Sequence, residues 1–117
     1  MKINGVELIF DATDADTLDK YLTAVDECSK ANAAIKPAGG NQEETIRMYR
    51  EICGTIKKVF DDIFGEGTGE KVCGKNDSVK TCSEAYISLM EEYNRQHEEQ
   101  QKRNAVLASF TEKYAAD

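Results

Sequence analysis

The sequence predicts a mainly α-helical single domain, in which three principal helices, the last of them long, follow a short N-terminal β-hairpin. Two observations carry this prediction. Between residues 46 and 63, apolar side chains recur every three or four positions, which is typical of a helix that buries one face. Near the N-terminus, Asn4-Gly5 is the strongest two-residue signal for a hairpin turn. A length of 117 residues favours one domain, 1–117.

Residues 1–10 are expected to form the hairpin. Both central positions of a type I′ turn need a positive φ, which asparagine and glycine tolerate. After the turn, Val6, Leu8 and Phe10 occupy alternate positions, as on one face of a strand. The first arm is only Lys2-Ile3, so the hairpin has to dock on the helices or on another chain.

The first helix is predicted over residues 14–35. Asp14 and Asp16 suit its first turn, where the helix dipole favours negative charge. Pro37 lacks an amide donor and two glycines follow it, so the helix ends before this segment. The expected apolar stripe consists of Leu18, Tyr21, Leu22, Val25 and Cys28.

The second helix is predicted over residues 42–64. Asn41 followed by Glu44 resembles a capping box, and Gly65 suits the position after the last turn. Gly54 weakens the middle of this helix, which a close contact with another helix would explain. The expected stripe consists of Ile46, Tyr49, Cys53, Ile56, Phe60 and Ile63.

Residues 65–78 are a glycine-rich connector, with one helical turn expected at 70–73. The third helix is predicted over residues 79–116, capped by Asp77 or Ser78. Its stripe consists of Val79, Cys82, Tyr86, Leu89 and Tyr93. The polar run that follows has favourable i,i+4 charge pairs, which indicates a solvated helix: Glu91 with Arg95, Glu98 with Lys102, and Glu99 with Arg103.

A second apolar stripe begins after the polar run, at Val106, Leu107, Phe110 and Tyr114. We expect this segment either to fold back on the body or to pack on another subunit. Leu107, Phe110 and Tyr114 are therefore the candidate protein-binding residues. The core is expected to contain Ile46, Ile56, Phe60, Leu89 and Tyr93 instead.

Composition argues against several kinds of partner. The net charge is −7 and the basic residues are scattered, which disfavours binding to a nucleic-acid backbone. No segment approaches the roughly 20 apolar residues of a membrane span, and the first ten residues do not form a signal peptide. The expected location is the cytoplasm, where cysteines stay reduced; Cys28, Cys53 and Cys82 lie on apolar stripes and are expected to be buried thiols.

No catalytic, cofactor-binding or metal-binding set is predicted. Residues 69–76 match the spacing of a phosphate loop except at Asn76, where a serine or threonine would bind magnesium, and they follow a helix rather than a strand. Cys73 and Cys82 are too far apart for the pairing of a structural zinc site. His97 lies in the polar run and is expected to be a solvated surface residue.

Two segments resemble a known family. One is MKINGVELIFDATDADTLDKY at the N-terminus; the other is VFDDIFGEGTGEKVCG, followed by TCSEAY. Together they are similar to small proteins from the tail-gene module of siphophages and prophages of Gram-positive bacteria, which include tail assembly chaperones. The resemblance covers residues 1–93. It rests on packing and turn residues and leaves out the C-terminal segment.

The resemblance implies a non-enzymatic role in building a phage tail, in the cytoplasm of the bacterial host. Such a chaperone binds the long, helical tape-measure protein, or another tail protein, before the tail tube forms around it, and requires no cofactor. Association with a second copy of the chain is a further expectation. Three alternatives stay open: a tail-completion or connector component of the virion that uses the hairpin to extend a neighbour's sheet, a small prophage regulator that binds a host protein, and an enzyme.

Overall fold

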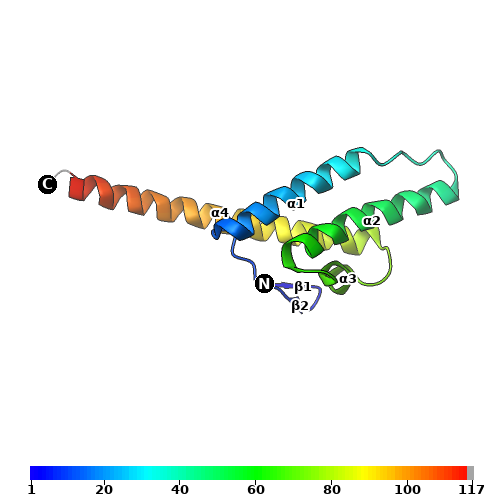
Figure 1. The fold of residues 1–117 in the computed structure, drawn as a ribbon, viewed down its shortest axis with the longest axis horizontal. Coiled ribbons are helices and arrows are strands. Elements are labelled where there is room, and N and C mark those ends of the chain that lie inside the picture. Colours follow the sequence, from blue (N-terminus) through cyan, green and yellow to red (C-terminus); the bar gives the residue numbers. More distant parts are fainter. Residues whose placement is uncertain (116–117) are drawn as a thin grey trace.

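The computed structural model describes residues 1–115 and consists mainly of helices (Figure 1). Its elements are β1 (Lys2–Ile3), β2 (Val6–Glu7), α1 (Ala15–Ala33), α2 (Gln42–Phe64), α3 (Thr68–Cys73) and α4 (Val79–Ala115). The predicted fold class is confirmed, and the described ends of the three long helices lie within two residues of the predicted ones.

The N-terminal hairpin has the predicted turn. Asn4 and Gly5 have φ values of 50° and 80°, and Ile3 pairs with Val6 in the antiparallel ladder. The Asn4 side chain also donates a hydrogen bond of 2.8 Å to the carbonyl of Val72, which docks the hairpin on α3. The hairpin therefore packs on the helices of its own chain.

The ladder is shorter than the alternation of apolar residues predicted. Pairing in β2 ends at Glu7, which lies opposite Lys2, and the amide of Leu8 donates to the Met1 carbonyl at 2.7 Å. The alternation itself persists beyond the ladder. Leu8 and Phe10 are buried, while Ile9 between them is 93 % exposed.

Side-chain caps begin the long helices. The Asp14 carboxylate accepts from the amide of Thr17 at 3.0 Å, and the Asn41 side chain accepts from the amide of Glu44 at 2.8 Å. The carboxylate of Glu44 accepts from Arg47, so it does not complete the expected capping box. Ser78 caps α4 by accepting from the amide of Thr81 at 3.2 Å.

The core lies where α1, α2, α3 and α4 meet the hairpin. Ile56, Phe60 and Leu89 are buried as predicted, and Tyr93 is half-buried against the core. All four cysteines are free thiols and buried, which confirms the expectation for Cys28, Cys53 and Cys82.

Three residues of the stripes predicted for the first and second helices are exposed. Ile46 and Tyr49 on α2 are 53 % and 47 % exposed, so the prediction that Ile46 belongs to the core is wrong. They lie beside the connector that precedes α4, and Arg50, one residue further along, forms an ion pair with Asp77 at 3.1 Å. Since α4 begins two residues after Asp77, it does not cover this end of α2. Leu22 on α1 is likewise exposed, against prediction.

A glycine does allow close helix packing, but it is not Gly54. A Cβ on Gly54 would meet no atom within 4 Å, so the expected close contact is absent there. A Cβ on Gly69 in α3 would lie 2.3 Å from the Lys57 carbonyl oxygen in α2. The Gly69 amide also donates to the Asp61 carboxylate at 2.7 Å. The glycine of the phosphate-loop-like segment thus packs α3 against α2.

Helix α4 is one continuous rod that leaves the body of the protein (Figure 1). Because of it, the molecule measures 71 × 28 × 19 Å. The C-terminal segment extends away from the body, so the alternative that it folds back is wrong. None of the described helices combines the length and the apolar character that crossing a bilayer requires.

Candidate protein-binding surface on the C-terminal helix

Aromatic stacking marks the last turn of α4 that packs into the body. The ring of Tyr93 stacks on that of Tyr21 in α1, with a centroid distance of 4.4 Å. The His97 ring stacks on that of Tyr93 with a centroid distance of 5.8 Å and belongs to an exposed residue. Burial raises the pKa of Tyr21 to about 12, so its hydroxyl stays neutral at physiological pH.

One side chain ties α4 to the segment that links the hairpin to α1. The Gln96 amide accepts from the backbone amide of Ala12 at 2.7 Å and donates to the Phe10 carbonyl at 2.8 Å. Since Phe10 and Ala12 are both buried, Gln96 satisfies backbone groups that have little access to water. Its amide also donates to Glu92 at 2.9 Å.

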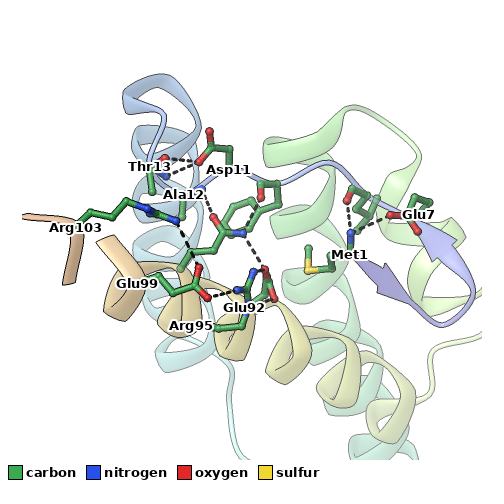
Figure 2. Close-up of polar contacts among 12 residues, drawn as sticks. Met1, Glu7, Asp11, Ala12, Thr13, Glu92, Arg95, Glu99 and Arg103 are labelled. Carbon is green, nitrogen blue, oxygen red and sulfur yellow. Dashed lines mark hydrogen bonds and ion pairs between the residues drawn. The ribbon is translucent and has the colours of Figure 1, made fainter. Parts of the chain in front are cut away.

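A row of charges runs along α4 at this anchor (Figure 2). Arg95 forms ion pairs with Glu92 and Glu99, and Arg103 pairs with Glu99 at 3.6 Å. The pair of Glu99 and Arg103 was predicted, whereas Arg95 pairs with Glu92 and Glu99 in place of the predicted Glu91. Hydrogen bonds from Arg95 and Gln96 lower the pKa of Glu92 to about 2.

Beyond the anchor, every residue from 101 to 113 is exposed. Val106, Leu107 and Phe110 are 55 %, 61 % and 52 % exposed. Leu107 and Phe110 are three residues apart and share one face of the helix, as the candidate site requires. The side chain of Tyr114, the third candidate residue, lies outside the described part of the structure.

A second apolar surface, which the sequence analysis missed, lies between α1 and α2. This α1–α2 groove has a volume of about 480 Å³, and its walls are residues 24–35 and 51–62. It is open because Ala31 and Gly54 face it with little or no side chain. The sequence signal for this groove was a series of alanines in and after α1, together with Gly54 in the middle of α2.

The described residues were compared with the needs of a metal site and of a reactive thiol. Among residues 1–115, no group of three or more His, Cys, Asp and Glu side chains is arranged to hold a metal ion. Cys53, Cys73 and Cys82 interact where α2, α3 and α4 meet, and burial raises the pKa of each thiol, that of Cys53 to about 12. They therefore stay protonated and lack the reactivity of a thiolate.

Comparison with protein families places most of the chain in one of them. Residues 4–117 match DUF6673, described as a family of unknown function. Comparison with curated proteins and with solved structures gives no significant match.

Proposed function

The chain belongs to the DUF6673 family, and from its own surface we propose that it is a non-enzymatic assembly protein of phage or prophage tails. It acts in the cytoplasm of the bacterial host as a chaperone that binds the tape-measure protein. The observation that carries the proposal is the projecting segment of α4, on which Val106, Leu107 and Phe110 are more than half exposed. The resemblance of residues 1–93 to tail-module proteins supplies the kind of partner.

The proposed binding mode is helix packing. A tape-measure protein is a long helix with apolar side chains that have to be covered before the tail tube encloses it. An exposed amphipathic helix covers such side chains by laying its apolar face against them. Each large side chain that becomes buried contributes about 1.5–3 kcal/mol, so a few residues suffice for reversible binding.

Co-expression with the tape-measure protein of the same gene cluster tests the proposal. We expect the two proteins to copurify, and the chain to raise the soluble fraction of the tape-measure protein. Leu107→Glu should weaken this complex at least about tenfold, because it places a charge in the apolar contact. The matched control is Ile87→Glu, which changes an apolar residue of similar exposure in the part of α4 that lies on the body. Failure of the wild-type proteins to copurify, or equal binding by both variants, would contradict the proposal.

The N-terminal hairpin favours a second candidate, a structural component of the tail. Its two strands are short, and Ile9 beside them is 93 % exposed. A neighbouring subunit that added a strand there would cover Ile9. Mass spectrometry of purified particles separates the candidates: a structural component is present in stoichiometric amounts, and a chaperone is absent.

A further inference from the structure

We propose that the chain associates with itself, with the projecting segment of one copy, residues 102–113, lying in the α1–α2 groove of another. The proposal concerns this chain alone and does not depend on the tape-measure protein. It rests on the shape of the two surfaces, on their charges and on the direction of α4.

The two surfaces match in length and in chemistry. The α2 wall of the groove, residues 51–62, and the projecting segment each comprise twelve helical residues, about 18 Å of helix, and the α1 wall continues two residues past the end of its helix. A Cβ on Gly54 would meet nothing within 4 Å, so there is room above this residue for a side chain from outside. The segment offers Val106 and Leu107, both more than half exposed.

The charges of the two surfaces are opposite. The rim of the groove carries the carboxylates Glu27, Glu51 and Asp62 against the ammonium group of Lys58, and Arg47 beside the groove pairs with Glu51 at 2.8 Å, so one negative charge is left over. Lys58 is shared between two of them, at 3.3 Å from Glu27 and 2.7 Å from Asp62. The projecting segment carries three basic residues and one acidic residue, a net charge of +2, whereas residues 1–101 hold 12 basic and 20 acidic residues, a net charge of −8. The segment is thus the basic part of an acidic chain and complements the groove.

The direction of α4 makes a second copy the occupant. The helix has no glycine or proline between Val79 and Ala115, so it has no residue at which helices usually kink. It carries the segment away from the end of the body where α1 and α2 are joined (Figure 1). The segment therefore cannot enter the groove of its own chain.

Sedimentation velocity of the full chain, with two variants and their mixture, tests the proposal. The wild type should associate in a concentration-dependent manner. Gly54→Leu fills the groove, Leu107→Glu disables the segment, and each should raise the Kd for self-association at least about tenfold. Leucine is a better helix former than glycine, and circular dichroism checks that both variants fold.

Mixing the variants distinguishes this arrangement from others. Gly54→Leu keeps an intact segment and Leu107→Glu keeps an intact groove, so the mixture should form a 1:1 complex that neither variant forms alone. A wild type that stays monomeric up to about 1 mM would overturn the proposal. Two other outcomes would do the same: association that Gly54→Leu does not weaken, as expected if two segments pair with each other, and a mixture that forms no complex. Ile87→Glu is the control and should associate like the wild type.

Discussion

Glu92 holds its charge because two neighbours on the same helix donate hydrogen bonds to it. The donors are Arg95 and Gln96, and Glu92 is only 20 % exposed, so water competes little for its carboxylate. Gln96 in turn bonds the backbone at Phe10 and Ala12. The charge of Glu92 therefore helps to hold the side chain that anchors α4 to the rest of the molecule.

The low pKa of Glu92 predicts a loss of stability in acid. Its pKa is lowered from 4.5 to about 2, so the folded state binds this proton less readily than the unfolded state does. The stabilisation is complete above pH 4.5 and is lost as the pH falls towards 2. After solvent screening we expect it to contribute on the order of 1–3 kcal/mol to the free energy of unfolding.

Urea unfolding of the wild type and of Glu92→Gln between pH 2 and pH 7 measures this contribution. The variant should be less stable than the wild type at pH 7 and nearly equal to it at the acid end. Glu98→Gln, at an exposed position of the same helix, is the control and should follow the wild type. A constant difference between Glu92→Gln and the wild type over the whole range would show that the stabilisation does not come from the charge of Glu92.

At the scale of the elements, α3 lies against α2 because Gly69 has no side chain. An alanine there would place its Cβ 2.3 Å from the Lys57 carbonyl oxygen, which belongs to the backbone and cannot rotate away. We expect Gly69→Ala to lower the free energy of unfolding by about 1–3 kcal/mol, the usual cost of overpacking.

Gly54→Ala is the matched control for that substitution. It too replaces a helical glycine by alanine, but its Cβ enters open space. It should raise the free energy of unfolding by about 0.5–1 kcal/mol, because alanine is the better helix former. Chemical denaturation measures both changes, and a loss of stability in Gly54→Ala would show that the α1–α2 groove is tighter than its geometry indicates.

The elements also show which features of the fold the spacing of apolar residues can predict. It identified the helices and most of the buried positions, since Ile56, Phe60 and Leu89 all lie in the core. The spacing failed to predict that Ile46 is exposed. It shows which face of α2 packs against other helices, but it does not show how far along that face the neighbouring helix α4 extends. It could not identify Gln96 either, since a glutamine in a polar run is expected to be solvated and its backbone partners lie 84 and 86 residues away.

The sequence predicted the exposed stripe of the candidate site. It predicted neither how far this stripe lies from the body nor the existence of the α1–α2 groove. The stripe depends on local spacing alone, and Leu107 and Phe110 lie at that spacing on a solvated helix. The groove depends on which small residues of two helices come to face each other. That is decided by the packing of α1 on α2, to which Ala31 and Gly54 give only a weak local signal.

At the scale of the whole molecule, the body and the projecting segment are expected to be independent in stability. The segment buries none of its residues from 102 to 113, so it contributes almost nothing to the core. A chain that ends at Asn104 keeps Gln96, the stacked pair of Tyr21 and Tyr93, and every buried residue of the core. Truncation should therefore shift Tm by less than about 4 °C, which corresponds to under about 1 kcal/mol.

Thermal unfolding followed by circular dichroism measures that shift, at a protein concentration low enough that association adds no stability. Full-length Leu107→Glu serves as the control, because it keeps the helix and changes only its apolar face. If truncation lowered Tm strongly while Leu107→Glu did not, the backbone of the segment would be part of the cooperative fold. The expected result is that both changes leave Tm within about 4 °C of the wild type and weaken binding at least about tenfold, because a helix with almost no part in its own core keeps its apolar side chains available to another chain.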